Sequence, residues 1–369
     1  MTNKKRILVL NYEFPPLGGG ASPVSYEISK GYAKLGHKVT VVTMHFKGLK
    51  KHEIKDKIEI FRVPCIRKKK EMCTTPEMLS YVLSAKHFLK QHMKTNKYDI
   101  CHCHFIIPTG LVALWLKKKY NLDYIITSHG SDVLGYNKRF SKVYPIISGR
   151  WKEIIREAKV VVTPSKFLQN KIKEITKQGK FEVIPNGIDS TNFKPMKKQN
   201  SILVVARLFP NKGVQDILDA LKPLADELRN KKWKVDIVGD GPYRSFLENK
   251  TKENNLSDLV TFHGWVDRNS KKMKEFYGHA KIFISASYFE SFGMTVLEAM
   301  SAGCYPIVSD IDAHREIVKG GMYFRIGNPP DLRRKVIKII GHEDIPIHNT
   351  LNKFLWASII NKYERDVQI

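Results

Sequence analysis

The hydrophobic positions of the chain occur in short runs, and these runs alternate with longer stretches in which apolar residues recur at helical spacing. Short apolar runs bounded by turn residues are typical of buried strands. In the first half, strands are predicted at 6–12, 37–43, 58–63, 99–105, 124–128, 159–163 and 181–184. Helices are predicted at 22–35, 75–94 and 108–118 and from Ser165 onward. Strands alternating with helices predict a doubly wound α/β sheet, which binds ligands at the carboxyl ends of its strands.

The second half of the chain repeats this pattern. Strands are predicted at 201–206, 235–238, 281–286 and 305–308, and helices at 214–228, 293–302, 313–318 and 331–340. The segment 194–200 between the halves is polar and contains a proline, which marks a domain boundary. We therefore predict a first domain over 1–185, a linker over 186–200 and a second domain over 201–345.

Length and composition favour a folded chain without a membrane span. The chain has 369 residues, of which 42% are hydrophobic, so two domains with sizeable cores are expected. No apolar run approaches the roughly 20 residues of a spanning helix, and the run 7–10 is too short for a signal peptide. The cysteines number 5 and are scattered, which fits a reducing cytosol. We therefore expect a cytoplasmic protein.

The formal net charge of +27 predicts a polyanionic partner. Candidates are an anionic membrane face, a phosphorylated lipid or nucleic acid, and a generally lysine-rich proteome would explain the same excess. The basic runs at 47–57, 67–70 and 117–119 all fall in the first domain. They lack the interleaved aromatic residues of a base-stacking surface, so no nucleic-acid partner is expected. The charged residues of the runs 47–57 and 67–70 are expected to be solvated.

The run 99–105, D-I-C-H-C-H-F, has the residue types of a metal site. In a strand, alternation sends Cys101 and Cys103 to one face and His102 and His104 to the other. One ion could not collect all four side chains, so we expect no metal here.

Candidate chemistry concentrates in the loop between the predicted strand 281–286 and the following helix. Glu290 lies in this loop, and Gly293 stands directly before the helix, whose free N–H groups and positive dipole end favour anions. Glu298 lies inside the helix, about two turns away from Glu290. Two carboxylates on either side of an anion-binding turn could hold the hydroxyl groups of a sugar nucleotide. The alternative is that both are solvated surface residues.

Three other loops follow predicted strands. Glycines 18–20 come after the first strand, where a flexible turn is the alternative explanation. His129 comes after the strand 124–128, where a histidine with a structural role is the alternative. Arg207 and Lys212 bracket the loop 208–213, and a guanidinium and an ammonium on one loop suit a diphosphate.

Several of these strings resemble motifs of one family. The string 290–303, E-S-F-G-M-T-V-L-E-A-M-S-A-G, resembles the signature of the family-four retaining glycosyltransferases of GT-B fold (glycosyl transferases group 1). Similar to other motifs of that family are P-P-L-G-G-G at 15–20, S-H-G-S-D at 128–132, P-N-G-I-D at 185–189 and A-R-L-F-P-N-K-G at 206–213. The resemblance extends over nearly the whole chain, and the motifs occur in the family's order.

The resemblance implies two Rossmann-like domains facing each other across a cleft, with the terminal segment 346–369 crossing back onto the first domain. It implies that a sugar is transferred from a UDP- or GDP-sugar with retention of configuration and without a required metal or other cofactor. The expected acceptor is a glycan or lipid-linked molecule of surface polysaccharide or glycolipid synthesis. The alternative is a non-catalytic nucleotide- or carbohydrate-binding protein of the same fold.

The resemblance also implies roles for single residues. Arg207 and Lys212 would clamp the leaving diphosphate, Glu290 would hold the sugar hydroxyls and His129 would orient the sugar. The remaining donor-binding residues would be Gly19, Gly20, Val266, Phe292, Gly293, Met294, Thr295 and Glu298, with Glu298 on the ribose. Asp132 would lie on the acceptor side. The string 311–316 departs from the family pattern, so the family's contacts to the donor sugar are not carried over to this loop.

Lipid-linked acceptors and the positive charge together suggest peripheral binding to the cytoplasmic membrane face. Each Lys or Arg near an anionic surface contributes about 1 kcal/mol. We expect this binding to be driven by charge, with little apolar insertion, and to be reversed by salt.

Overall fold

The computed structural model describes residues 4–70, 72–135, 144–342 and 351–367. The chain divides into two compact units, Met1–Gly187 together with Trp356–Ile369, and Ile188–Leu355. The change of unit falls between Gly187 and Ile188, so residues 188–200 of the expected linker belong to the second unit.

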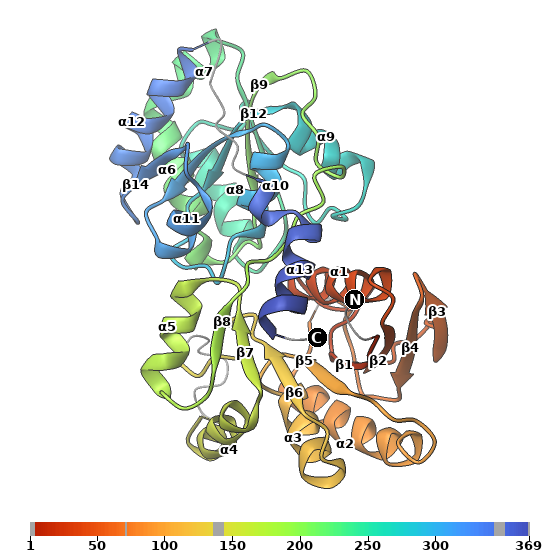
Figure 1. The fold of residues 1–369 in the computed structure, drawn as a ribbon. Helices are drawn as coiled ribbons and strands as arrows, with labels where there is room; N and C mark the ends of the chain where they lie inside the picture. Colours follow the sequence, from red (N-terminus) through yellow and green to blue (C-terminus); the bar gives the residue numbers. More distant parts are fainter. Residues whose placement is uncertain (1–3, 71, 136–143, 343–350, 368–369) are drawn as a thin grey trace. The chain divides into compact units, whose positions relative to one another are not determined.

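The first unit is built on an eight-stranded sheet that is parallel except at one edge (Figure 1). Its spatial order is β3 (His52–Lys55), β4 (Ile58–Val63), β2 (Lys38–Met44), β1 (Arg6–Leu10), β5 (Ile100–His104), β6 (Tyr124–Thr127), β7 (Val160–Thr163) and β8 (Phe181–Val183). The chain winds outward from β1 in one direction and then from β5 in the other. The carboxyl ends of β1 and β5 therefore form the switch point at which such sheets bind ligands.

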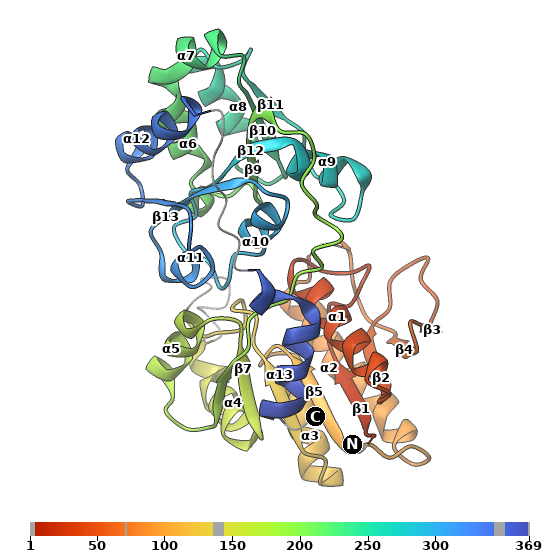
Figure 2. The same ribbon diagram turned by 45° about the horizontal axis from the view of Figure 1, so that its top comes forward.

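Helices cover both faces of this sheet. One face is covered by α2 (Thr75–His92), α3 (Thr109–Tyr120), α4 (Tyr144–Glu157) and α5 (Lys166–Ile175). The other is covered by α1 (Ala21–Lys34) and the terminal helix α13 (Trp356–Val367), which lie side by side in Figures 1 and 2. A Cβ on Gly31 of α1 would lie 2.4 Å from Cγ1 of Ile360, so the glycine permits this close helix contact.

The second unit contains a six-stranded parallel sheet. Its order is β11 (Val260–Phe262), β10 (Lys234–Val238), β9 (Gln199–Val205), β12 (Ala280–Ser285), β13 (Tyr305–Ser309) and β14 (Met322–Phe324). The core on one face involves α6 (Val214–Leu221), α7 (Ala225–Asn230), α8 (Arg244–Glu253) and α12 (Pro329–Ile340). The core on the other face involves α9 (Lys271–His279), α10 (Met294–Ser301) and α11 (Asp312–Ile317). The switch point of this sheet lies between β9 and β12.

Some elements differ from the sequence prediction. The expected helix 214–228 is divided into α6, a 3-10 turn at Lys222–Leu224 and α7, because Pro223 cannot donate a backbone hydrogen bond. The helix expected after the turn 239–242 is α8, whereas the sequence pattern did not predict β3, α4, β11, α9 or β14. The strand β3 is a charged edge strand, so the apolar alternation that marks a buried strand is missing there.

Alternation in β5 occurs as expected. Cys101 and Cys103 belong to the core beneath α2 and α3, and His102 lies on the other face against Tyr32 and Tyr363. In the described part of the chain, no group of three or more His, Cys, Asp and Glu side chains could hold a metal ion. Within the same residues, no helix has both the length and the apolar character that a membrane crossing requires.

Candidate active site

Two loops meet at the switch point of the second sheet. The loop after β9 carries Arg207 and Lys212, and the loop after β12 carries Glu290. The backbone N–H of Tyr288 donates to the carbonyl of Asn211 at 2.9 Å, which joins the loops. A Cβ on Gly213, which has a φ of 67°, would lie 2.1 Å from the Ala286 carbonyl oxygen. Only glycine permits this approach, so the local sequence allows the two loops to come together.

Lys212 and Glu290 form an ion pair in which the ammonium donates to Oε1 of the carboxylate. The hydroxyl of Ser287 donates to the same oxygen at 2.8 Å, and both charged side chains are largely buried. Burial raises the pKa of Glu290, but the charge and hydrogen bond of Lys212 and the bond from Ser287 outweigh it and hold the pKa below its usual value. Glu290 is therefore ionised, and an arriving phosphate would compete with it for Lys212.

Gly293 precedes α10 with a φ of 104°, a conformation that side chains with a Cβ rarely adopt. The first N–H groups of a helix have no partner within the helix. The half-buried Met294 and Thr295 open this helix and place such groups beside the Glu290 loop. The structure thus places an anion-favouring helix end next to the Lys212 ammonium.

His314 is a buried residue of this region to which the sequence analysis assigned no role. Its Nδ1 lies 2.9 Å from the Ser309 carbonyl oxygen and its Nε2 3.3 Å from the Ser285 hydroxyl. Because a carbonyl only accepts, Nδ1 carries the proton and Nε2 accepts. Burial lowers the pKa of His314, although Ser309 and Glu290 offset part of the effect. The imidazole is therefore neutral. It lies against Gly293, because a Cβ on that glycine would be 3.5 Å from Cδ2 of the ring. Its position after the carboxyl end of β13 was the available sequence signal.

Glu298 is buried rather than solvated. Its carboxylate accepts hydrogen bonds from Nε of Arg268 at 2.6 Å and from the Tyr277 hydroxyl at 2.8 Å. Burial and the neighbouring carboxylate raise the pKa of Tyr277 well above its usual value, so the phenol remains a donor. Each carboxylate oxygen has two acceptor positions, so these bonds leave capacity for further hydroxyl groups. Neither Arg268 nor Tyr277 was recognised from the sequence.

The remaining candidates of the second unit, Arg207, Phe292 and Val266, differ in how far their side chains are exposed. Arg207 is exposed, and its guanidinium lies 5.6 Å from the centre of the Phe209 ring. Phe292 is buried and packs against Phe354, so its side chain belongs to the core and is not offered to a ligand. The side chain of Val266 packs against the same core, which leaves its backbone as the group for a donor contact.

In the first unit, Asp132 joins the loops that follow β5 and β6. Its carboxylate accepts from the N–H groups of Ile106, His129 and Gly130 and from the Ser128 hydroxyl, at 2.7 to 3.2 Å. Burial raises the pKa of Asp132, although these hydrogen bonds oppose the effect. The structure therefore gives Asp132 the role of holding the His129 loop, whereas the resemblance placed it on the acceptor side.

His129 follows β6 and contacts a second histidine. Its Nε2 lies 3.1 Å from Nδ1 of His104, and the two rings are nearly parallel. Burial lowers the pKa of His129 to about 3, and burial also lowers the pKa of His104 well below its usual value. Both rings are neutral near pH 7, so one N–H lies between them. From the sequence, His104 was considered only as a ligand of a metal site that strand alternation argues against, and no contact with His129 was predicted.

The loop 18–20 follows β1 at the switch point of the first sheet. A Cβ on Gly19 or Gly20 would meet no atom within 4 Å, so this backbone borders open space. The N–H of Gly18 donates to the Lys70 carbonyl at 2.8 Å. The guanidinium of Arg67 is buried and donates to the carbonyls of Tyr12 and Lys70 at 3.3 and 2.8 Å. Arg67 thus positions this loop, and the expectation that the whole run 67–70 is solvated is wrong for Arg67.

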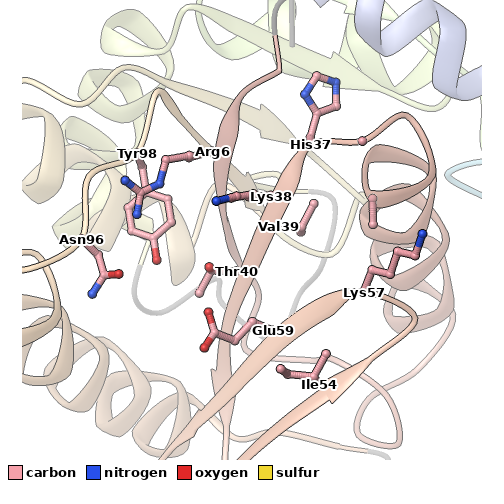
Figure 3. A pocket seen from close by; sticks show the side chains of 12 residues that line it. Arg6, His37, Lys38, Val39, Thr40, Ile54, Lys57, Glu59, Asn96 and Tyr98 are labelled. Atoms are coloured by element: carbon pink, nitrogen blue, oxygen red, sulfur yellow. The ribbon is translucent and has the colours of Figure 1, made fainter.

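A pocket of 480 Å³ lies elsewhere in the first unit (Figure 3). Its wall includes Arg6, Lys38, Thr40, Glu59, Asn96 and Tyr98. Arg6 and Lys38 begin β1 and β2, so the pocket is at the amino ends of the strands. Ligands of open α/β sheets bind at the carboxyl ends, and none of the candidate residues lines this pocket. We do not place the active site there.

Comparison with known proteins yields two family models. The model described as Glycosyl transferases group 1 matches residues 188–351, and that described as Glycosyltransferase Family 4 matches residues 18–192. An uncharacterized glycosyltransferase of Methanocaldococcus jannaschii is 25% identical, over 96% of this chain and 95% of that protein. The alpha-monoglucosyldiacylglycerol synthase of Acholeplasma laidlawii is 24% identical, over 86% and 84% of the two chains.

Solved structures show the same fold. Sucrose-phosphate synthase from Thermosynechococcus elongatus superposes with a TM-score of 0.77 at 19% identity, covering 98% of this chain and 94% of that one. The Anabaena protein HepE, in complex with UDP and glucose, superposes with a TM-score of 0.76 at 18% identity, covering 99% of each chain.

Proposed function

Because the chain belongs to the group 1 glycosyltransferases of GT-B fold, we propose that it moves a sugar from a UDP- or GDP-sugar to a glycan or lipid-linked acceptor with retention of configuration. The observation that carries this proposal is the Lys212–Glu290 pair at the switch point of the second sheet, beside the N-terminus of α10. A cation, an ionised carboxylate and a helix end in one place fit a phosphorylated sugar.

In the proposed reaction, Lys212 and Arg207 stabilise the charge that develops on the leaving diphosphate, together with the N–H groups of Gly293, Met294 and Thr295. Lys212 is held near the site by Glu290, and Arg207 is exposed on the same loop. Groups aimed at a developing charge are usually the largest single contribution to catalysis. Because the chain supplies these positive groups itself, we propose that the reaction requires no metal.

The bond changes of a front-face transfer are compatible with these residues. The bond between the anomeric carbon and the donor phosphate breaks, and the acceptor oxygen bonds to that carbon on the same face. The acceptor proton passes to the leaving phosphate, so no protein base is required. Glu290 is ionised and accepts from hydroxyl groups of the sugar. Glu298 is proposed to accept from the ribose and Val266 to contact the base.

For the first unit, we propose that neutral His129 hydrogen-bonds a sugar hydroxyl and that the backbone of Gly19 and Gly20 contacts phosphate or acceptor. Open space around these glycines supports such an approach. The low pKa of His129 supports a hydrogen-bonding role in place of a charged one.

We propose that the acceptor belongs to glycolipid or surface polysaccharide synthesis and that the enzyme is a peripheral protein of the cytoplasmic membrane face. Support comes from two relatives named alpha-monoglucosyldiacylglycerol synthase, and from a structural neighbour described as a glycosyltransferase involved in lipopolysaccharide biosynthesis. The net charge of +27 fits an anionic membrane surface.

The test is release of free nucleoside diphosphate from a panel of UDP- and GDP-sugars, with and without lipid-linked and glycan acceptors. We expect one donor to be consumed by wild-type protein and the Lys212→Ala variant to be strongly impaired. Nucleotide binding without turnover for every donor and acceptor would instead indicate a non-catalytic binding protein and overturn the proposal.

A further inference from the structure

Helix α2 exposes an apolar and basic stripe. Leu79 and Leu83 are 56% and 64% exposed, although large apolar side chains of helices normally face the core. Lys86 and Lys90 follow at positions i+7 and i+11 from Leu79, so all four lie on one side of the helix. The buried side of α2 is formed by other residues, including Tyr81 and Leu89. The two leucines therefore contribute little to the core of the described structure.

The loop before α2 extends this surface. Ile66 is 65% exposed, and Met72 is exposed as well. The N–H of Ile66 donates to the Ser80 hydroxyl at 3.1 Å, which holds the loop against α2. Residues 68–70 between them are exposed lysines. We call the exposed side chains of Ile66, 68–70, Met72, Leu79, Leu83 and Lys90, together with the half-buried Lys86, the α2 surface.

Positive charge continues from this surface across the adjacent helices. Helices α2, α3 and α4 lie next to each other along one side of the first unit (Figure 1). Burial lowers the pKa of Lys86, and the guanidinium of Arg150 on α4 lowers it further. Ile146, one turn before Arg150, is also exposed. The apolar side chains thus have basic residues on both flanks.

The α2 surface is connected to the glycine loop of the candidate site. Helix α2 begins after the carboxyl end of β4, so Leu79 lies toward the edge of the sheet that also carries the loop 18–20. The Lys70 carbonyl accepts from the N–H of Gly18, and buried Arg67 donates to the carbonyls of Tyr12 and Lys70 in the two loops that meet here. A ligand that holds residues 66–70 therefore also holds the backbone next to Gly19.

We propose that the α2 surface docks the protein on an anionic lipid membrane, with Ile66, Leu79 and Leu83 inserted among the lipids and the lysines at the head groups. Exposed leucines flanked by lysines have the composition of an interfacial surface. A second copy of the chain is the less suitable occupant, because each copy carries a formal charge of +27 and the surface is basic. The inference rests on the proposed membrane location and differs from the sequence expectation of little apolar insertion.

The experiment is co-sedimentation of the full chain with vesicles of phosphatidylcholine, with or without phosphatidylglycerol, in the absence of any nucleotide sugar. We expect binding only with phosphatidylglycerol. The double variant Leu79→Gln/Leu83→Gln should bind at least about tenfold more weakly, since two apolar side chains no longer insert. The variant Lys86→Gln/Lys90→Gln should bind about 30-fold more weakly at low salt.

Matched controls come from the second unit. Ile326 and Ile337 are 44% and 43% exposed, and the variant Ile326→Gln/Ile337→Gln should bind like the wild type. The same holds for Lys252→Gln/Lys272→Gln, which removes two exposed charges. All these side chains except the half-buried Lys86 are exposed, so the melting temperatures should stay close to that of the wild type. A variant with a lowered melting temperature is replaced by the corresponding single substitution.

Three outcomes would overturn the proposal. Wild-type binding of the leucine variant would exclude apolar insertion, and absent binding to anionic vesicles would exclude the membrane. A wild-type dimer in sedimentation velocity that the leucine variant abolishes would identify a second copy as the occupant. Nucleoside diphosphate release with a soluble acceptor is measured separately, so a failure of docking is distinguished from a failure of the proposed activity.

Discussion

The ammonium of Lys212 donates a hydrogen bond to the carboxylate of Glu290, which lies 78 positions later in the chain. The contact forms because β9 and β12 are neighbours in the second sheet and their carboxyl-end loops meet. Each charge offsets the burial of the other, and an isolated buried charge is unfavourable. This pairing keeps a cation and an ionised acid together before any substrate arrives.

Removal of the positive groups is expected to reduce turnover. Lys212→Ala and Arg207→Ala should each lower kcat by about 10²–10³, as is found when other groups that stabilise a developing charge are lost. The exposed Lys222, in the 3-10 turn after α6, provides a control, and Lys222→Ala should retain the wild-type rate. Steady-state release of nucleoside diphosphate is the measurement. If both variants of the loop turned over at the wild-type rate, the diphosphate assignment would be wrong.

Glu298→Ala should weaken donor binding and also lower stability. The substitution leaves the hydroxyl of buried Tyr277 without its acceptor, at a cost of about 1–3 kcal/mol. Calorimetric titration with UDP and GDP and chemical unfolding measure the two effects. Tyr277→Phe is the matched variant, because it removes the same hydrogen bond and leaves the carboxylate in place. Equal nucleotide affinities of the Ala and Phe variants would mean that Glu298 acts through structure alone.

Activity should persist in excess EDTA. The proposed site relies on Lys212, Arg207 and the N-terminus of α10 for charge stabilisation, so chelation of Mg²⁺ or Mn²⁺ should leave turnover within about twofold of its initial value. The assay is run with protein dialysed against EDTA and then with either ion restored. A strict dependence on the restored ion would contradict the proposed Arg and Lys clamp.

Stability should fall as the pH decreases from about 6.5 toward 3. Burial lowers the pKa of His102 and of His129 to about 3, whereas an unfolded histidine titrates near 6.5. Between these values the unfolded state binds more protons, so protonation favours unfolding. Each such histidine contributes at most about 1.4 kcal/mol per pH unit.

The measurement is the free energy of unfolding by denaturant at several pH values for wild type and His102→Gln. His102 is the informative position because it is completely buried and bonded to Tyr32 and Thr127. The variant should be less stable than the wild type at pH 7. Between about pH 6.5 and 3, its free energy of unfolding should fall less steeply with decreasing pH, because one proton fewer is taken up on unfolding. An unchanged slope would show that His102 titrates normally in the folded protein.

The sequence alone determined most of the strands, the α/β class and the loops that carry the candidate residues. These features depend on local patterns, such as the short apolar run at β12 and the glycine before α10. The alternation of Cys101 and His102 in β5 was predicted for the same reason, because the two-residue period of a strand follows from its backbone. Charged edge strands such as β3 were missed since they lack this pattern.

Only the tertiary structure decided which of these residues touch. The order of the strands brings together Lys212 and Glu290, His314 and Gly293, and His104 and His129. No pattern in the neighbouring sequence predicts any of these contacts. Burial also could not be read from residue type. Arg67 and its neighbour Lys68 belong to one basic run, yet the Arg67 guanidinium is enclosed by carbonyl groups while Lys68 is exposed. The reason is physical: a charged side chain can be buried wherever the fold supplies partners, and those partners come from distant parts of the chain.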